Sequence, residues 1–457
     1  MDKDLINDLA SILPEGSITA VEEELVCYGS DATRVFARPD VVVRPTDADS
    51  IPEVMIVAAR HGMPVVPRGA GTGLSGGCVP IKGGIVVSTE RLNRIREIDT
   101  IDLVAVVEPG VVTQDIHEAA EAEGLFYPPD PASFKACTIG GNVAENAGGL
   151  RGLKYGVTRD YVLSLKVALP GGGVMVAGGR TLKNVTGYDM ARLFVGSEGT
   201  LGFILEAALK LIPKPETKAA FLAAYDTLEH ASEAVVSIVR SGVTPSTLEI
   251  MDRVTLDAVE AYRNTGNEVR HGALLLVEVD GSDVEVRRQA DALDAVLGRT
   301  APAELRRATD LAEQAALWAA RRSALSALAR VSPSVILEDA TVPRKQIPAM
   351  VRAIEGIAKK YDLKIGTFGH AGDGNLHPTI ITDLRIADNR KRVEAAVSDI
   401  FDAALALGGT LSGEHGIGLA KSSFMEREVG RSGVAVMRAV KDAIDPRGLM
   451  NPGKMFV

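Results

Sequence analysis

Short apolar runs separated by glycine and proline turns dominate the first half of the chain. Such runs, when rich in valine and isoleucine, are typical of buried strands. The clearest of them are residues 64–67, 84–88 and 103–107. Two segments between them carry apolar residues at helical spacing and lead to a glycine, a common helix end. These segments are residues 51–60 and 113–123. The pattern over residues 47–211 therefore predicts an α+β unit.

From residue 221 onward, strand and helix patterns alternate along the chain. The predicted strands are residues 221–225, 247–251 and 273–279, and the predicted helices are residues 228–240, 253–263, 282–297, 311–329, 347–360 and 388–407. Two prolines in residues 212–216 close the strand predicted over residues 203–211 and mark a boundary. Charged helix faces around an apolar strand indicate an open sheet covered by helices. We therefore expect a second α+β domain, followed by a turn-rich tail over residues 445–454.

Composition excludes several classes of function. The 457 residues carry 50 basic and 60 acidic side chains without a basic run, so the charge pattern of a nucleic-acid-binding protein is absent. The cysteines Cys27, Cys78 and Cys137 are isolated, which excludes a disulfide framework and a CxxC metal or iron–sulfur site. The acidic N-terminus and the lack of an apolar run of roughly 18 to 20 residues argue against a signal peptide and a membrane span. We expect a cytoplasmic protein, with peripheral association at the inner face of the membrane left open.

A glycine-rich loop follows the first predicted strand, where residues 68–77 have the sequence RGAGTGLSGG. Residues 71–76 match the G-x-G-x-x-G dinucleotide fingerprint, but that site needs a helix to begin at its third glycine. Further glycines and Pro80 follow at once, so no helix can start here. The backbone N–H groups, with the hydroxyls of Thr72 and Ser75, can instead turn toward an anion. A tight turn is the alternative, but five glycines in residues 69–77 exceed its needs, so we predict a phosphate-binding loop.

Two further stretches combine glycines with small polar residues. Residues 138–149 have the sequence TIGGNVAENAGG, shortly after PPDPAS at residues 128–133, and residues 195–202 have the sequence VGSEGTLG. Their glycines would let the backbone approach a flat ring system whose edge the two asparagines could bind, although a buried connection between strands is an alternative. In this order the three stretches resemble the FAD domain of the vanillyl-alcohol oxidase and para-cresol methylhydroxylase type of flavoprotein.

This resemblance implies an α+β fold with a two-part FAD-binding domain of the vanillyl-alcohol oxidase type. The residues that it assigns to FAD are Arg68, Gly69, Ala70, Gly71, Thr72, Gly73, Ser75, Gly76, Pro129, Thr138, Gly141, Asn142, Asn146, Gly149, Glu198, Gly199, Ile204 and Asn451. Covalent attachment in some relatives requires a histidine or cysteine near the isoalloxazine. The first loop has no histidine and Cys78 lies at its far end, so we expect non-covalent FAD.

Three histidines near the C-terminus suggest a metal site. His370 and His377 lie in the segment GHAGDGNLH, whose glycines allow a hairpin-like loop that brings both imidazoles to one point. The third, His415, follows Glu414 in the segment SGEHGIG. Two imidazoles and a carboxylate with open positions suit a divalent Lewis acid, and the imidazoles favour Zn²⁺ or Mn²⁺ over Mg²⁺. A single histidine is more often structural, but three beside glycines favour a shared function.

Glu414 and His415 are assigned different roles because adjacent side chains in an extended segment point to opposite sides. Glu414 completes the metal site with His370 and His377. His415 is the general base, since an imidazole with its ordinary pKa near 6.5 can accept a proton at neutral pH. The reverse assignment, with His415 as ligand and Glu414 outside the ligand set, remains open.

The two histidine motifs and the NPGK tail at residues 451–454 resemble the C-terminal half of FAD-linked D-2-hydroxyacid dehydrogenases. This group includes D-lactate dehydrogenase and the glycolate oxidase flavin subunit, and the resemblance covers roughly residues 40–456. It implies that Arg321, in the segment LWAARR, receives the substrate carboxylate, with Trp318 packed beside it. A solvated helix face is the alternative for this arginine pair. Glu338 stands where relatives acting on hydroxyglutarate place a lysine, which disfavours a dicarboxylic substrate.

The resemblance thus implies FAD-dependent oxidation of a small D-2-hydroxy acid, D-lactate or glycolate, to the 2-oxo acid by hydride transfer to flavin N5. Its expected domains are an FAD-binding domain over residues 1–215, a substrate or cap domain over residues 216–410, and a C-terminal catalytic segment over residues 411–457 that returns to the FAD site. Without iron–sulfur ligands, the chain would pass electrons to a separate acceptor: an iron–sulfur subunit, an electron-transferring flavoprotein, a quinone or oxygen. The oligomeric state is open, with a homodimer as one option. A non-redox alkyl transferase on the same fold and a non-catalytic flavin-binding subunit are the alternatives.

Overall fold

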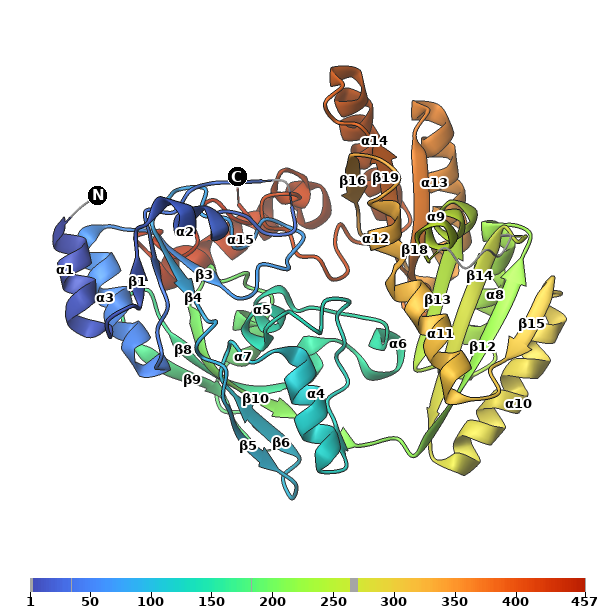
Figure 1. Cartoon of the computed structure of the whole chain (residues 1–457), viewed down its shortest axis with the longest axis horizontal. Helices are drawn as coiled ribbons and strands as arrows, with labels where there is room; N and C mark the ends of the chain where they lie inside the picture. Colours follow the sequence, from blue (N-terminus) through green and yellow to red (C-terminus); the bar gives the residue numbers. More distant parts are fainter. Residues whose placement is uncertain (1–2, 34, 182, 264–269, 457) are drawn as a thin grey trace. The chain divides into compact units, whose positions relative to one another are not determined.

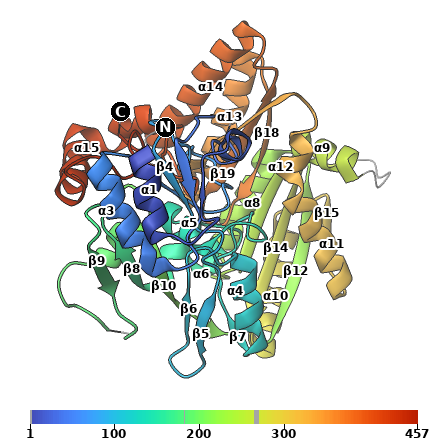
Figure 2. The ribbon, with the colours of Figure 1, turned by 60° about the vertical axis from the view of Figure 1, so that its left-hand side comes forward.

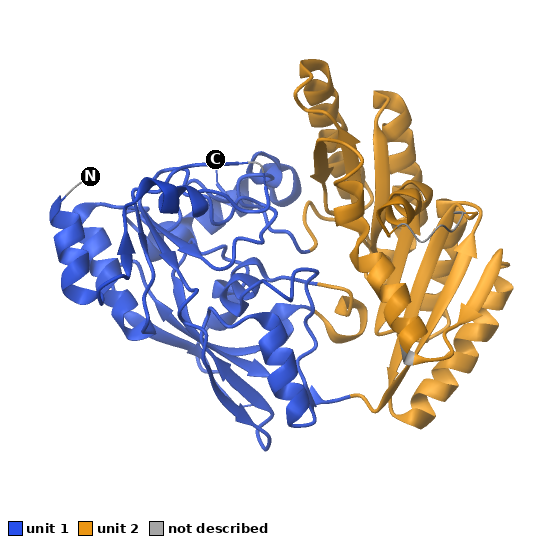
Figure 3. Cartoon of the chain, in the orientation of Figure 1, with its two compact units in different colours: residues 1–148, 157–214, 414–457 blue, residues 149–156, 215–413 orange. Residues whose placement is uncertain are grey.

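The computed structural model describes residues 3–33, 35–181, 183–263 and 270–456, and the chain divides into two units (Figure 3). Unit 1 consists of Met1–Gly148, Val157–Lys214 and Glu414–Val457, and unit 2 consists of Gly149–Gly156 and Pro215–Gly413. The domains predicted from the sequence have other bounds: residues 149–156 and Pro215 belong to unit 2, not to the FAD-binding unit, and so do residues 411–413, which precede the last segment of unit 1. The chain enters unit 2 at Gly149, the last residue of a stretch predicted to contact FAD.

Unit 1 is built on two sheets and a short strand pair. The mixed four-stranded sheet has the order β1 (Ile18–Thr19), β2 (Val41–Val43), β4 (Ile85–Ser88), β3 (Val65–Arg68). The antiparallel five-stranded sheet has the order β5 (Ile95–Asp99), β6 (Val104–Val107), β10 (Phe203–Lys210), β8 (Val162–Ala168), β9 (Val174–Gly178). The short pair consists of β7 (Leu125–Phe126) and β11 (Ile212–Pro213). The buried runs predicted as strands thus form β3, β4, β6 and β10.

The helices of unit 1 are mostly short. They are α1 (Lys3–Ile12), α2 (Glu22–Cys27), α3 (Ile51–His61), α4 (Thr113–Ala122), α5 (Ile139–Glu145), α7 (Met190–Phe194) and α15 (Met425–Ile444). The helices predicted over residues 51–60 and 113–123 are confirmed as α3 and α4, with Gly62 at φ +64° and Gly124 at φ +72° at their ends. Figure 2 shows α1 and α3 side by side, and both contribute buried side chains to one apolar core.

Helix α15 was not predicted from the sequence, although its apolar residues recur at helical spacing. Met425 is its one buried residue among those described, so most of this apolar face is not part of a core. Gly430 interrupts it at φ +69°, a backbone conformation that favours glycine. No helix within the described part of the chain is long and apolar enough to cross a membrane.

Unit 2 is an antiparallel sheet covered by helices (Figure 1). Its strand order is β15 (Glu304–Arg307), β12 (Thr217–Tyr225), β14 (Ala273–Gly281), β13 (Thr247–Asp252), β18 (Lys364–His370), β19 (Asn375–Thr382), β16 (Ser334–Leu337), with β17 (Ala340–Thr341) also paired to β19. One face packs against α8 (Leu228–Arg240), α10 (Asp283–Arg299), α13 (Ile347–Tyr361) and α14 (Ala387–Ala406). The other face packs against α9 (Arg253–Arg263), α11 (Leu311–Arg322) and α12 (Ala324–Leu328). The predicted open sheet covered by helices is confirmed.

Two local features of unit 2 were not predicted. The helix predicted over residues 311–329 is two helices, α11 and α12, which meet at Ser323. The Ser323 hydroxyl donates a hydrogen bond to the Ala320 carbonyl, and such local bonds compete with the regular helix ladder. The segment at residues 149–156 contains α6 (Gly152–Tyr155), and Lys154 Nζ lies 2.5 Å from Asp280 Oδ1 on β14. This ion pair fixes the segment to the sheet of unit 2.

Candidate functional site

The glycine loop of unit 1 contains no helix. Between the end of β3 at Arg68 and the start of β4 at Ile85 the chain forms only turns and bends, as the sequence predicted. Gly71 and Gly76 have φ values of +71° and +82°, which side chains rarely allow. Arg68 Nη1 donates to the Ser30 carbonyl at 2.7 Å, so this predicted FAD residue also holds the loop to the preceding segment.

One hydroxyl in the glycine loop and one in the 138–149 stretch are available to bind a ligand. Ser75 Oγ and Thr138 Oγ1 are buried and have no hydrogen-bond partner among the described residues. The two stretches that carry them are in close contact, because a Cβ atom built on Gly69 would lie 2.2 Å from Thr138 Oγ1. A buried hydroxyl without a partner costs about 1 to 3 kcal/mol. Both residues were predicted to contact FAD, and its diphosphate would supply the missing acceptors, so the residues present fit this cofactor.

The two asparagines that were predicted to contact FAD also form hydrogen bonds within the protein. Residues 139–145 form α5, and Asn146 ends it at φ +54°. Asn142 Nδ2 donates to Thr113 Oγ1 at 2.6 Å, and Asn146 Oδ1 accepts from the Arg159 amide at 2.9 Å. These bonds hold α5 in place. Among the other residues assigned to FAD, Gly149 belongs to unit 2, where it is the first residue of the segment Gly149–Gly156.

Glu198 and Asn451 connect three chain segments of unit 1. The Glu198 carboxylate accepts hydrogen bonds from the amides of Ile417 and Gly418 at 2.7 and 2.6 Å. Asn451 Nδ2 donates to the carbonyls of Gly77 and Glu198, each at 2.8 Å. The C-terminal segment therefore packs against the glycine loop and the 195–202 stretch.

Glu145 is a candidate that the sequence analysis did not single out. Its Oε2 atom is buried without a hydrogen-bond partner among the described residues, and a Cβ on Gly77 would lie 2.5 Å from its Oε1. Burial and the nearby Glu198 raise the pKa of Glu145 well above its usual range. A protonated carboxyl group at this position could donate a hydrogen bond to a ligand in the glycine loop. The signal in the sequence was a lone acid within a stretch of small residues.

The Gly73→Val variant should fold normally and lose FAD. A Cβ atom at Gly73 has no neighbour closer than 3.9 Å and the backbone is outside the left-handed region, so the protein itself accommodates a side chain there. A side chain would therefore strain the backbone at Gly71 and Gly76 but not at Gly73. The valine would occupy space needed by the diphosphate, so the purified protein should be colourless, with the melting temperature of wild-type protein from which FAD has been removed.

The matched control is Gly171→Val, at an exposed turn of the same unit where a Cβ would meet nothing within 4 Å. This variant should purify yellow. Full FAD content in Gly73→Val, measured from the flavin absorbance per protein, would show that the loop does not bind the diphosphate.

The histidine motif of unit 2 is a β-hairpin, as predicted. β18 and β19 pair antiparallel, with His370 opposite Asn375 and Phe368 opposite His377, and residues 371–374 form the turn. The rings of His370 and His377 lie perpendicular to each other with centroids 5.1 Å apart. One nitrogen of each ring lies within 4.8 Å of the other, a separation that a single cation can bridge. Their spacing therefore fits two ligands of one ion.

Two buried carboxylates accompany these histidines, and sequence reasoning missed both as site residues. Glu249 Oε1 lies 2.7 Å from His370 Nδ1, and Asp339 Oδ1 lies 3.9 Å from His377 Nδ1. Burial alone would raise the pKa of Glu249, but Arg321 and His370 together lower it below its usual range. Glu249 lies within a short apolar strand and Asp339 follows one. Many acidic residues without a function occupy such positions, so the indication of a site in the sequence was weak.

Arg321 lies in this cluster and Arg322 does not. Arg321 is 6% exposed on α11, its Nη2 atom is 2.5 Å from Glu249 Oε2, and its guanidinium lies 4.8 Å from the Phe368 ring centroid. Its Nε is buried with no hydrogen-bond partner among the described residues. Arg322 is exposed. The structure therefore gives a buried position to the arginine that was predicted to bind a carboxylate.

Trp318 lies one helical turn before Arg321. It is buried, and its indole Nε1 donates to Glu278 Oε2 at 2.8 Å. The tryptophan thus anchors α11 to β14.

Glu414 and His415 begin the last segment of unit 1. The chain before them is fixed in unit 2, because the Gly413 amide and Ser412 Oγ donate to Asp339 Oδ2 at 2.8 and 2.9 Å. Within unit 1, a Cβ on Gly148 would lie 2.6 Å from Glu414 Oε2. The predicted metal ligands are therefore divided, with His370 and His377 in unit 2 and Glu414 in unit 1.

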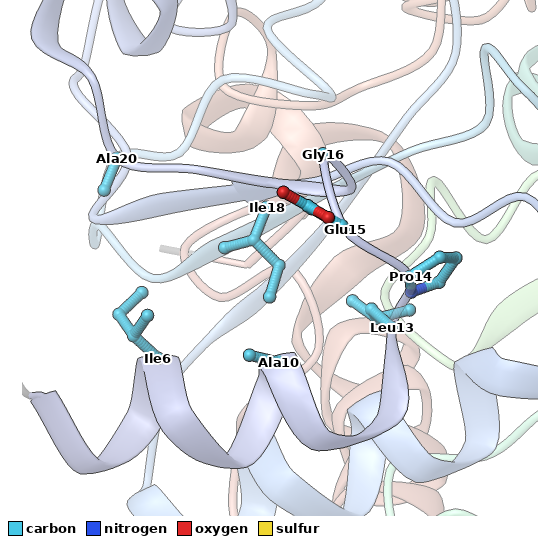
Figure 4. Close-up of a pocket in the computed structure, with 8 residues that line it drawn as sticks. All are labelled: Ile6, Ala10, Leu13, Pro14, Glu15, Gly16, Ile18 and Ala20. Carbon is cyan, nitrogen blue, oxygen red and sulfur yellow. The ribbon is translucent and has the colours of Figure 1, made fainter.

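A pocket near the N-terminus is unrelated to these residues. Ile6, Leu13 and Ile18 line it together with Glu15 (Figure 4). It contains none of the residues predicted from the sequence to bind a cofactor or substrate, and its lining is mainly apolar. We assign it no part in the site.

The chain matches two family models, "FAD binding domain" over residues 39–178 and "FAD linked oxidases, C-terminal domain" over residues 214–455. It is 50% identical to the glycolate oxidase subunit GlcD of Bacillus subtilis over 94% of this chain and 92% of the relative. It is 38% identical to GlcD of Escherichia coli K12, over 97% and 89% of the two chains. It is 35% identical to a D-lactate dehydrogenase of Anaerostipes hadrus, over 95% and 91%.

Solved structures share the fold at low sequence identity. p-Cresol methylhydroxylase aligns with a TM-score of 0.81 at 15% identity, over 99% of this chain and 96% of that chain. Alkyldihydroxyacetonephosphate synthase aligns with a TM-score of 0.78 at 19% identity, over 99% and 86%. The predicted resemblance and fold class are confirmed.

Proposed function

The chain belongs to the FAD-linked oxidases, and from this premise we propose that it oxidises a small D-2-hydroxy acid, D-lactate or glycolate, to the 2-oxo acid. It is an FAD-linked oxidoreductase. One observation carries the proposed substrate class: a buried arginine, whose Nε has no hydrogen-bond partner among the described residues, shares Glu249 with His370, one of two imidazoles with perpendicular rings. The guanidinium can bind a carboxylate, and the imidazoles lie where they can act on an oxygen of the neighbouring carbon. The names of the relatives, glycolate oxidase subunit and D-lactate dehydrogenase, agree with this class.

Arg321 binds the substrate carboxylate in this proposal. A guanidinium binds a carboxylate through two parallel hydrogen bonds, which fixes the position of C2 as well as adding affinity. Glu249 occupies Nη2, so the substrate uses the remaining donors, including Nε. Glu249 already compensates the positive charge of Arg321. The direction of the remaining N–H donors therefore contributes more to substrate selection than the net charge of the site does.

His415 accepts the proton of the C2 hydroxyl on a ring nitrogen as the substrate is oxidised. His370, His377 and Glu414 would hold a divalent cation, Zn²⁺ or Mn²⁺, which when bound polarises that hydroxyl. The donor set fits such an ion, because His370 Nδ1 faces a carboxylate and leaves Nε2 as the ligand atom. The residues of unit 1 would hold FAD, which would supply the acceptor for the hydride that leaves C2. The assignment with His415 as ligand in place of Glu414 remains the alternative.

The electrons then leave to a separate acceptor. The described cysteines are single residues, and no disulfide joins them. We propose an iron–sulfur subunit, an electron-transferring flavoprotein or a quinone as the acceptor, in line with the word subunit in the names of the GlcD relatives. The alternative of a non-redox alkyl transferase has only a likeness in fold at 19% identity in its favour.

Anaerobic titration with hydroxy acids tests the proposed function. D-Lactate or glycolate should bleach the flavin absorbance of the purified yellow protein, whereas L-lactate should leave it oxidised. D-2-Hydroxyglutarate should act poorly, since Glu338 stands where a lysine would bind a second carboxylate. If no 2-hydroxy acid reduces the flavin, the proposed substrate class is wrong.

Chelation should abolish flavin reduction by substrate while FAD remains bound. The hydroxyl proton of an alcohol, whose pKa lies far above neutral pH, is costly to remove without a polarising cation. Metal content by mass spectrometry and the rate of anaerobic flavin reduction should fall together after dialysis against a chelator, and added Zn²⁺ or Mn²⁺ should restore both. Unchanged turnover in metal-free protein would contradict the metal role of His370 and His377.

A further inference from the structure

Glu249 has no chemical role in the mechanism above, yet its carboxylate touches two residues that do. It lies on β13 in the interior of the sheet, directly opposite His370 on β18, and is 1% exposed. A carboxylate taken from water is costly unless its oxygens are paired. Both oxygens face a partner: Oε1 lies within hydrogen-bond distance of His370 Nδ1, at 2.7 Å, and Oε2 forms an ion pair with Arg321 Nη2 at 2.5 Å.

The contact with His370 determines which ring nitrogen can bind a cation. An ionised carboxylate only accepts hydrogen bonds, so Nδ1 must carry the proton in this contact. Nε2 is then the unprotonated ring nitrogen, which is the one that can ligate a metal ion. Histidine ligands commonly donate their second nitrogen to a carboxylate, which fixes the ring orientation and raises the basicity of the ligand atom.

The contact with Arg321 determines the direction of the guanidinium. Nη2 is held by Glu249, and the Phe368 ring lies 4.8 Å from the guanidinium carbon. Phe368 is two residues before His370 on the same strand, so both side chains project from the same face of the sheet. The guanidinium and the imidazole are therefore placed by neighbouring positions of one rigid sheet.

We propose that Glu249 is a positioning residue that holds the carboxylate-binding Arg321 and the metal-binding His370 in a fixed mutual geometry. The proposal deepens the proposed function and rests on it. Because C1 and C2 of a 2-hydroxy acid are bonded, the group that binds the carboxylate and the cation that polarises the hydroxyl must be held at one separation. One side chain that contacts both residues sets this separation directly.

The other acids near the site do not share this arrangement. Asp339 Oδ1 is 3.9 Å from His377 Nδ1, too far for a hydrogen bond, and its other oxygen accepts from Ser412 and Gly413. Glu278 on β14 accepts a hydrogen bond from Trp318 on α11 and lies 3.1 Å from Lys218 Nζ, so its contacts are with the helix anchor and a lysine. Glu278 is therefore a matched control, a buried glutamate that anchors the same helix.

Glu249→Gln tests the proposal in FAD-loaded protein. Glutamine keeps the size but removes the charge and offers one acceptor oxygen in place of two, so it cannot keep both the hydrogen bond with His370 and the ion pair with Arg321. After removal of metal, titration with Zn²⁺ against a competing chelator should show an affinity about 10- to 100-fold below wild type. The Kd for D-lactate, taken from the concentration dependence of flavin reduction, should rise about tenfold. FAD content should not change, and Glu278→Gln should match wild type in both affinities.

Glu249→Asp separates positioning from simple charge compensation. It keeps the negative charge but is one methylene shorter and cannot reach both partners. We expect it to retain the melting temperature of wild type more closely than Glu249→Gln, yet to lose Zn²⁺ affinity to a similar extent. If Glu249→Gln does not fold, this variant decides the question. Wild-type Zn²⁺ and D-lactate affinities in Glu249→Asp would reduce Glu249 to a counter-charge and overturn the proposal.

Measurements on the wild-type protein distinguish failure of the proposed function from failure of the positioning role of Glu249. If wild-type protein neither binds Zn²⁺ nor is reduced by a hydroxy acid, the proposed function fails and the role of Glu249 fails with it. If wild-type protein does both and Glu249→Gln does both equally well, the positioning role alone is wrong.

Discussion

Replacing His415 by alanine is expected to lower the rate of flavin reduction by about 10² to 10⁴. A general base interacts with the substrate mainly in the transition state, so the Kd for the hydroxy acid should change little. Anaerobic stopped-flow measurements at several substrate concentrations separate the two quantities. The variant should remain yellow, because His415 is not among the residues that we propose to contact FAD.

Metal analysis of His415→Ala and Glu414→Gln resolves the assignment left open by the sequence. If Glu414 is the third ligand, Glu414→Gln should lose Zn²⁺ affinity and His415→Ala should keep it. The opposite result would make His415 the ligand and would leave the base unidentified. A His415→Ala variant with normal metal content and normal rate would remove His415 from the mechanism altogether.

Arg321→Ala is expected to lower kcat/KM by about 10² to 10³, which corresponds to loss of one buried, hydrogen-bonded charge contact. The apparent substrate Kd should rise and the saturating rate should fall, because both affinity and orientation depend on this side chain. Arg321→Lys should recover only part of the activity, since an ammonium group cannot form the planar two-bond contact. Arg322→Ala should behave like wild type, because that side chain is exposed on the same helix.

Arg321→Ala also leaves Glu249 buried without its cationic partner, which costs about 3 to 5 kcal/mol of stability. The double variant Arg321→Met/Glu249→Gln removes both charges and should regain stability without regaining substrate binding. This difference separates a folding defect from a binding defect. Normal affinity for D-2-hydroxy acids in Arg321→Ala would place the carboxylate elsewhere and contradict the proposed substrate class.

Much of the fold could be predicted because its signals are local. Turn glycines and β-branched runs indicated β3, β4 and β6, and the glycine after each apolar helical segment indicated the ends of α3 and α4. The absence of a helix after Gly76 could also be predicted from neighbouring residues, since Pro80 and several glycines follow within a few positions. The hairpin carrying His370 and His377 was predictable for the same reason. Its two histidines are close in sequence, and the turn between them contains two glycines.

The partners of these residues could not be predicted in this way. Glu249 and His370 are separated by 121 positions, and their contact exists because β13 and β18 are neighbours in the sheet, an order that no local pattern encodes. The choice of Arg321 over Arg322 likewise depends on which face of α11 packs against that sheet, and the one-residue difference between burial and exposure follows from the helical repeat. Residue types at short spacing thus predicted the chemistry. Strand order and helix packing determined which carboxylates and which guanidinium accompany the histidines, because those contacts join segments that meet only after the sheet has formed.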